Sequence, residues 1–399
     1  MKERRYDLDW LRVIAMLAVF IFQCTRLFDT PGWHLKNAEQ SALLSVVTRG
    51  LLRPWLMEVF FLLSGAAAWY ALQSRSAEAY LLDRAKRLLI PLYTVGLFIL
   101  LPPQFYYDLV TNAGYRGSFW ATLPRYFNEL GLPKITSSPD TLLRLPFGGH
   151  LWFLQYLFLM SLLTLPILLY LKSERGRRFI GGLSALCGRA EDLFLFVVPL
   201  AVALTGLRWL FVGQRTWAEW VFYALFFLAG YVMMADKRFT QDLETLWQES
   251  GVLWLLAAAG QAVVVLGLGY NLERQSFSPL YVLYQILVSI LSWSAVVFVL
   301  GVAARFPNRK HRILALANEA ALPFYLLHQT IILIVGSFVI RWDLGILPKL
   351  LAVMAISFPL ILVLYGVLVW PWNVVRFLFG MRPRERAAPE PESEVMAVR

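Results

Sequence analysis

Ten apolar runs, each about twenty residues long, recur along this 399-residue chain. They occupy residues 8–28, 51–72, 88–110, 151–171, 191–212, 217–234, 251–270, 280–304, 321–340 and 347–370. A helix needs ~20 mostly apolar residues to cross the hydrocarbon core of a bilayer, so each run has the length of one membrane span. Only 16% of the residues are charged, whereas soluble domains average ~25%. The runs therefore predict an all-α, polytopic membrane protein with about ten transmembrane helices.

The net charge of +11 is concentrated in alternate connections between these runs. Basic residues gather around 75–87, 172–189, 305–312 and 382–386, and the connections between these clusters are sparser in charge. The positive-inside rule places such loops in the cytoplasm, so both chain ends are expected there. The connection 235–250 is an exception, because its acidic residues offset its Lys and Arg. This distribution is typical of cytoplasmic loops rather than of a nucleic-acid surface, and we expect no nucleic acid as a partner.

The chain divides into a membrane domain, residues 1–381, and a cytoplasmic tail, residues 382–399, whose Pro, Glu and Arg content predicts disorder. The first run lacks a small-x-small cleavage site and is expected to stay as a span. The connection 111–150 is expected to form either a structured cap or a plain loop. Cys24 and Cys187 fit no zinc motif, and no metal is expected.

The first run contains two polar residues that share one face of a helix. Arg12 and Gln23 are eleven residues apart, so they differ by ~20° in direction and by ~16 Å along the axis. Charges inside a membrane are usually retained for a task, but each residue also has a plain structural interpretation. Arg12 is either an anion site or an interfacial anchor, and Gln23 is either a deep site residue or an interhelical hydrogen bond.

The next two runs add a carboxylate and a pair of guanidinium groups. Glu58 lies near the outer end of the second run, where it can orient a neighbouring base. Ser64, Gly65 and three alanines follow it and predict close helix packing. Arg84 and Arg87 are one turn apart at the entry of the third run. They either bind the phosphates of a donor or serve only as topology charges.

Two of the four histidines lie in distinctive positions. His150 is at the outer mouth of the fourth run beside Trp152, and His328 is near the middle of the ninth. A buried histidine is either a structural hydrogen-bond centre or a site residue, and the sequence leaves both open for His328. His34 and His311 lie in connections and carry no such signal.

Five motifs in order along the chain make it resemble the acyltransferase-3 family of bacterial integral membrane proteins. That family includes glucan succinyltransferases and polysaccharide O-acetyltransferases. The motifs are LDWLRVIA with Arg12, an acidic residue followed by xFFxLSG from Glu58, the pair Arg84-x-x-Arg87 before a Pro, HLWFL from His150, and FYLLHQ from Phe324. The resemblance covers nearly all of the chain before the tail.

The resemblance implies transfer of an acyl group from acyl-CoA, most often acetyl-CoA, to a hydroxyl of an extracytoplasmic glycan or lipid. The expected cellular location is a bacterial inner membrane, which the chain crosses several times. Arg12, Arg84 and Arg87 would hold the CoA phosphates at the cytoplasmic side, and a base in the first span, aided by Glu58, would activate the acceptor. In the family that base is a His separated from the Arg by ten intervening residues. His150, Trp152 and His328 would contact substrate or support the site.

This chain departs from the pattern because Gln23 occupies the position of that His. An amide does not take up a proton at neutral pH, although its size and hydrogen bonding resemble those of His. We therefore expect this form to be catalytically crippled, either through a substitution or as a natural non-catalytic homologue.

Two other functions remain open from the sequence. One is a transporter or flippase for a lipid-linked sugar, which would be expected to show repeats and discontinuous helices, and the sequence shows neither. The other is a sensor that binds acyl-CoA without transferring the acyl group. The acceptor, the acyl length and the oligomeric state are not determined by the sequence.

Overall fold

The protein is described by a computed structural model that covers residues 5–129, 149–187, 189–213, 215–270, 277–305 and 311–384. Within these residues the chain is helical, and its only β-type pairing is an isolated bridge between Asp29 and Ser41. The α-helices are α1 (Tyr6–Thr25), α2 (Ala42–Val47), α3 (Arg53–Ser74), α4 (Ala77–Pro91), α5 (Leu101–Asn112), α6 (Phe119–Glu129), α7 (Trp152–Leu163), α8 (Leu165–Lys172), α9 (Glu174–Leu186), α10 (Val197–Leu207), α11 (Trp217–Ala235), α12 (Trp247–Ala262), α13 (Pro279–Ala304), α14 (Arg312–Val339), α15 (Ile346–Leu364) and α16 (Asn373–Leu378).

The predicted all-α membrane architecture is confirmed. Eight stretches of helix in the described residues are long and apolar enough to cross a bilayer, and the number rises to 10 if two bent helix pairs each count as one span. The eight stretches are Tyr6–Thr25, Ala42–Ser74, Ala77–Asn112, Trp217–Ala235, Trp247–Gly267, Pro279–Ala304, Arg312–Val339 and Ile346–Val369. The bent pairs are α7 with α8, and α9 with residues 191–207. The fold is therefore a polytopic helical bundle.

The fourth predicted run, 151–171, forms two helices rather than one straight helix. α7 and α8 meet at Thr164 with a bend of 50°. Pro166 explains the break, because proline lacks the N–H needed to continue the ladder and its ring clashes with the preceding turn. At the end of α7 the Met160 carbonyl accepts from both the Thr164 backbone N–H, at 3.0 Å, and the Thr164 hydroxyl, at 2.6 Å.

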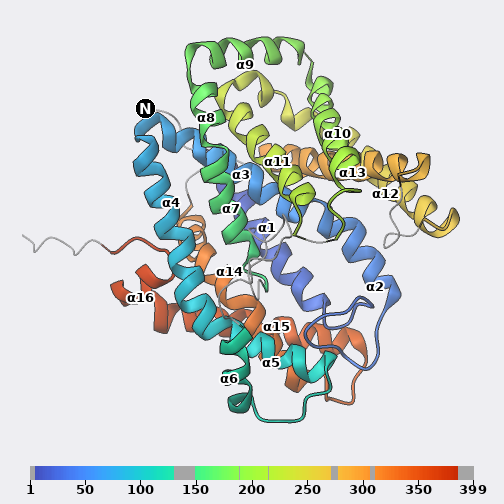
Figure 1. The fold of residues 1–399 in the computed structure, drawn as a ribbon, viewed down its shortest axis with the longest axis vertical. Coiled ribbons are helices and arrows are strands. Elements are labelled where there is room, and N and C mark those ends of the chain that lie inside the picture. Colours follow the sequence, from blue (N-terminus) through green and yellow to red (C-terminus); the bar gives the residue numbers. More distant parts are fainter. Residues whose placement is uncertain are drawn as a thin grey trace, which may run out of the picture.

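α1 passes through the middle of the bundle, where α14 runs beside it in the same direction (Figure 1). Three contacts establish this register. Near the start of both helices Arg12 hydrogen-bonds Asn318, further along the ring of Phe20 packs on that of Phe324, and near the end Leu27 packs on Gly336. The two helices therefore carry side chains at matching levels along their whole length.

α3 and α11 form the closest helix pair of the bundle, as the run of small residues after Ser64 predicts. A Cβ added to Gly65 would lie 1.8 Å from the Phe227 carbonyl oxygen, and one added to Gly230 would lie 1.9 Å from that of Leu62. No side chain fits at either distance. Close backbone approach of this kind is the usual use of small residues in membrane helices.

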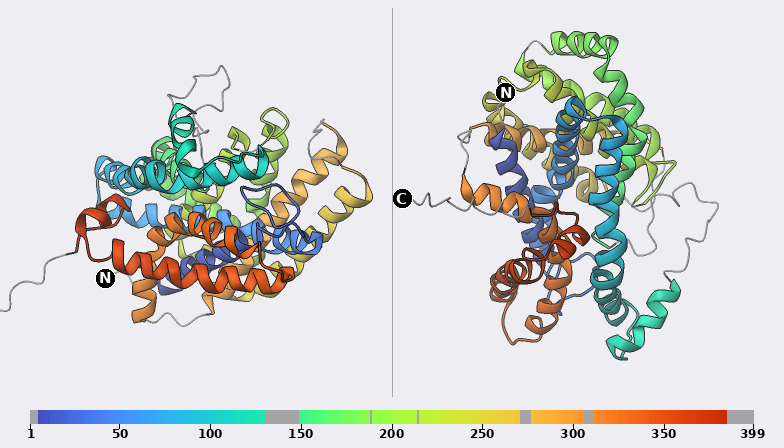
Figure 2. Two further views of the ribbon diagram at one scale, coloured as in Figure 1. Left: turned by 90° about the horizontal axis from the view of Figure 1, so that it is seen from below. Right: turned by 90° about the vertical axis from the view of Figure 1, so that its left-hand side faces the viewer.

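The basic connections lie together at one end of the bundle. The Lys172 ammonium donates to the Leu72 carbonyl at 2.6 Å, and the ring of Trp10 lies 6.3 Å from that of His311. We call this the basic end. The opposite end, called the loop end, contains residues 26–52 and 340–346. Figure 2 shows α9 and α6 at opposite extremes of the molecule, with α9 at the basic end.

Candidate active site

Arg84 and Arg87 lie at the basic end among other arginines. The charged groups that act on Arg87 are Asp83 and three guanidinium groups, those of Arg382, Arg84 and Arg75. Asp83 is already paired with Arg75 at 3.2 Å. The cluster therefore holds more positive than negative charge, as a phosphate site requires.

The arginine cluster is built on backbone contacts between α4, α3 and α16. Arg84 donates to the Ser64 carbonyl at 3.3 Å and its guanidinium lies 5.3 Å from the centre of the Tyr80 ring. α16 approaches so closely that a Cβ on Gly380 would lie 2.4 Å from the Arg87 carbonyl oxygen. The cluster is thus held by the fold rather than by opposite charges.

Arg12 belongs to the same end, but it contacts α14 instead. Its guanidinium lies 3.3 Å from Asn318 Oδ1 and 3.3 Å from Asp9. The next residue of α14, Glu319, binds the buried Arg376 at 2.8 Å. Arg12 is half-buried and in part satisfied by these neighbours. The structure therefore places Arg12 at the basic end, against α14.

His150 is the centre of a buried hydrogen-bond network between α5, α7 and α14. Its Nε2 donates to the Leu326 carbonyl at 3.0 Å, because a carbonyl can only accept. Its Nδ1 consequently accepts from Gln104 Nε2 at 3.2 Å. The Gln104 amide also binds Thr330 at 2.9 Å and Gln329 at 3.0 Å. Both ring nitrogens of His150 are therefore occupied.

His328 packs against His150 but is bonded on one side only. The two rings are 5.1 Å apart and nearly perpendicular. His328 Nδ1 lies 2.6 Å from the Tyr325 carbonyl, so Nδ1 carries the hydrogen of the neutral ring. Its Nε2 is buried and has no hydrogen-bond partner among the described residues. Nε2 therefore carries a buried lone pair that accepts no hydrogen bond from a described residue.

Gln23 lies at the level of His328. It follows Phe20 by three residues on α1, and His328 follows Phe324 by four residues on α14, so each is about one turn beyond the Phe20–Phe324 contact. Gln23 is half-buried, whereas His328 is only 1% exposed. Gln23 and His328 therefore lie at the same level of the bundle.

A row of aromatic rings lies between Glu58 and this layer. The ring of Phe61, one turn further along α3, lies 4.9 Å from that of Phe153, which lies 5.9 Å from that of Tyr325. Trp152 joins the same wall by packing 5.7 Å from the ring of Tyr223. Glu58 is 5% exposed and its Oε2 has no partner among the described residues. A buried carboxylate oxygen without a hydrogen bond lowers the stability of the fold. It therefore marks a place where a ligand with a hydrogen-bond donor is expected to bind.

The loop end contains a third polar group, centred on Asp29, which the sequence analysis did not single out. Asp29 is fully buried and binds Arg26 and Lys36, the latter at 2.7 Å. Burial lowers the pKa of the Lys36 ammonium and Asp29 opposes that shift. On α15, Lys349 donates to the side chain of Asn37 at 3.1 Å. These contacts fasten the loop after α1 over the end of the bundle.

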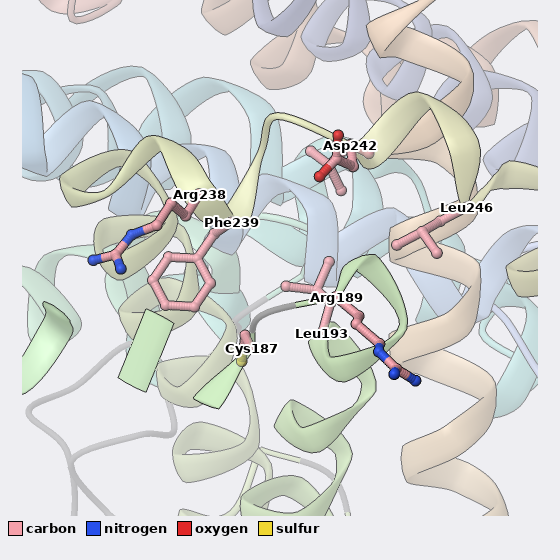
Figure 3. A pocket seen from close by; sticks show the side chains of 8 residues that line it. Cys187, Arg189, Leu193, Arg238, Phe239, Asp242 and Leu246 are labelled. Carbon is pink, nitrogen blue, oxygen red and sulfur yellow. The ribbon is translucent and has the colours of Figure 1, made fainter. Parts of the chain in front are cut away.

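Two cavities lie away from the layer of Gln23 and His328. One is at the basic end beside Cys187, where the guanidinium groups of Arg189 and Arg238 point to opposite sides (Figure 3). Its volume of about 10 Å³ holds about one water molecule and no substrate. The other, about 110 Å³, is lined by apolar side chains of α10, α11 and α13, with Trp293 among them. Neither cavity is lined by Glu58, Gln23 or His328.

The structure therefore brings some predicted residues together and leaves others apart. Arg84 and Arg87 form one cluster, and His150 and His328 form another. Glu58 and Trp152 approach the second cluster through aromatic rings. The sequence analysis missed Gln104, Tyr325, Gln329 and Thr330. The signal for two of them was present, since His328, Gln329 and Thr330 are three successive polar residues inside an apolar run. The connection 130–148 and residues 385–399 lie outside the described residues, but Arg384 contacts the bundle through the ring of Trp370.

The described residues form a helical membrane bundle with an arginine cluster at one end and buried histidine and carboxyl groups in its interior, which is the class of an integral membrane protein. The model of the acyltransferase-3 family, described as an acyltransferase domain, matches residues 5–369, and the chain belongs to that family. Glucans biosynthesis protein C of Salmonella paratyphi B and that of Salmonella schwarzengrund are each 24% identical to it over 403 residues, covering 95% of both chains. No solved structure matches the chain at a significant level. The family assignment favours a membrane acyltransferase over a transporter.

Proposed function

We propose that this protein transfers an acyl group from acyl-CoA to a hydroxyl group of a glycan or lipid on the far side of a bacterial inner membrane. Acetyl-CoA is the first donor to test. The basic end would face the cytoplasm, in agreement with the positive-inside rule. The relatives' name, glucans biosynthesis protein C, supports a glycan acceptor.

The observation that carries this proposal is the helix pair α1–α14. It joins Arg12 at the basic end to the layer of Gln23 and the buried His328. Arg12 and Gln23 belong to one continuous helix, and their eleven-residue spacing corresponds to ~16 Å. A long donor can therefore bind its phosphates at Arg84 and Arg87 and present its thioester in the interior.

The interior layer supplies the environment that acyl transfer needs. It is buried, so charge–dipole interactions act more strongly there than in water. Glu58 and the wall of Trp152 and Tyr223 would contact the acceptor or the acyl group. In this proposal Gln23 contributes hydrogen bonding but no base, and the expected consequence is slow turnover.

The test is CoA release by the purified protein, measured with a thiol reagent for a series of acyl-CoA donors and oligoglucan acceptors. Gln23→His restores a base at this position and is expected to raise the rate about 100-fold, the lower end of what general-base catalysis contributes. Gln23→Asn is the matched control, because it keeps an amide and introduces no base.

Three outcomes separate the functions. Absence of CoA release by both forms, together with absence of CoA binding, would refute the proposal. CoA binding without transfer, even by Gln23→His, would indicate a donor-binding sensor. Movement of a lipid-linked sugar without any acyl donor would indicate a transporter.

A further inference from the structure

We propose that His328 is the general base through which this chain, with Gln23 in place, activates the acceptor hydroxyl. The inference rests on the proposed acyl transfer and assigns the proton-accepting atom. It requires a neutral ring with a free lone pair, a position at the layer of Gln23, and burial that excludes competing water.

The hydrogen-bond pattern determines which nitrogen is basic. The Tyr325 carbonyl 2.6 Å from Nδ1 can only accept, so the ring hydrogen is on Nδ1. Nε2 then carries the lone pair, and no described residue donates to it. A carbonyl that orients one nitrogen and leaves the other free to take a proton is the arrangement that orients catalytic histidines.

His150 shows that this arrangement is specific to His328. It is also buried and lies 5.1 Å away, yet its Nδ1 accepts from Gln104 and its Nε2 donates to Leu326. A ring with both nitrogens bonded cannot take up a proton without breaking a buried hydrogen bond. Of these two neighbouring histidines, only His328 has an available lone pair.

The position of His328 also fits. It lies on α14 one turn beyond Phe324, whose ring packs on Phe20 of α1, and Gln23 lies one turn beyond Phe20. The two helices run in the same direction, so His328 and Gln23 are at one level of the bundle. In this proposal an acceptor bound at position 23 receives its base from the same level of the neighbouring helix.

The acceptor hydroxyl transfers its proton to Nε2 while its oxygen forms a bond to the thioester carbonyl carbon. The carbon–sulfur bond then breaks, and the departing thiolate takes the proton from the imidazolium. The products are an ester and CoA with a free thiol, and His328 returns to its neutral form. The Tyr325 carbonyl stabilises the transient positive charge on the ring.

The experiment is a double-mutant cycle between positions 23 and 328. His328→Asn retains an amide N–H for the Tyr325 carbonyl and removes the basic nitrogen. In the Gln23 chain we expect it to lower kcat at least 100-fold, with KM for acyl-CoA changed less than threefold. In the Gln23→His chain the same substitution is expected to lower kcat less than tenfold, because a second base is present. His311→Gln, at the start of the same helix, is the matched control.

The dependence of the His328→Asn effect on the residue at position 23 distinguishes a base from a structural residue. A purely structural His328 would lower activity equally in both backgrounds, and that result would overturn the inference. So would a Gln23 chain without turnover alongside an active Gln23→His chain, although that result would leave the proposed function standing. If His328→Asn does not fold in the Gln23 background, His328→Gln replaces it, with the same expected dependence on position 23.

Discussion

The loop end and the interior layer both bury polar side chains, but they differ in whether the buried polar atoms have hydrogen-bond partners. At the loop end, Asp29 is paired with two cations, and Lys349 donates to Asn37 and to the Ile340 carbonyl at 2.9 Å. In the interior layer, Glu58 Oε2 and His328 Nε2 are buried without partners among the described residues. Buried polar groups are nearly always hydrogen-bonded, because an unmade bond costs about 1–3 kcal/mol.

This difference separates polar groups that hold the fold from groups that are available for chemistry. A saturated network contributes stability and has no capacity to bind a ligand. An unsaturated one lowers stability and is retained where a substrate supplies the missing partner. Three substitutions test the distinction.

The largest effect is expected at the saturated loop end. Asp29→Asn removes a fully buried carboxylate and leaves the partly buried Arg26 and Lys36 without their counter-charge, so the free energy of unfolding should fall by about 3 kcal/mol. Unfolding in mixed detergent micelles measures it. The activity of the molecules that remain folded should change little.

Asp236→Asn provides the control for Asp29→Asn. Hydrogen bonding to Arg238 lowers the pKa of Asp236 to about 2, so the stability from this pair is present above the ordinary aspartate pKa and lost as the pH falls towards 2. The pair is solvent-exposed, and its loss at neutral pH should be far smaller than that of Asp29. Equal losses at the two sites would contradict the distinction between buried and exposed pairs.

At Glu58 we expect a loss of activity without a loss of stability. Glu58→Gln removes a carboxylate whose Oε2 has no described partner, so thermal stability should not fall. The rate of acyl transfer should fall about 30-fold, since a hydrogen bond to a charged group contributes about 2 kcal/mol. Acyl-CoA turnover together with the melting temperature measures both. A loss of stability at unchanged specific activity would assign Glu58 to the fold.

The smallest effect is expected at the basic end, where Arg84 is held by a carbonyl and an aromatic ring and forms no ion pair with a described residue. Arg84→Ala should weaken CoA binding about fivefold, and the difference should shrink in high salt because the contact is electrostatic. Calorimetry at two salt concentrations measures it. Arg178→Ala, on exposed α9, is the control and should leave CoA affinity unchanged. Unchanged affinity in Arg84→Ala would remove the arginine cluster from the donor site.

The sequence by itself determined the architecture. Runs of about twenty apolar residues admit only membrane helices, since the bilayer offers no partner for an unpaired backbone. The five motifs indicated the family, and the small residues after Ser64 predicted close helix packing, although not that α11 is the partner. These properties are local, so spacing and composition suffice to predict them.

Tertiary structure alone decided which polar residues are saturated. His150 and His328 look alike as isolated histidines in apolar surroundings, and only the placement of Gln104 and the Leu326 carbonyl distinguishes them. Asp29 and Glu58 look alike as acidic residues near the ends of spans, but only Asp29 meets Arg26 and Lys36. Hydrogen bonds depend on distances of a few tenths of an ångström between helices remote in sequence, and residue spacing along one helix does not encode them.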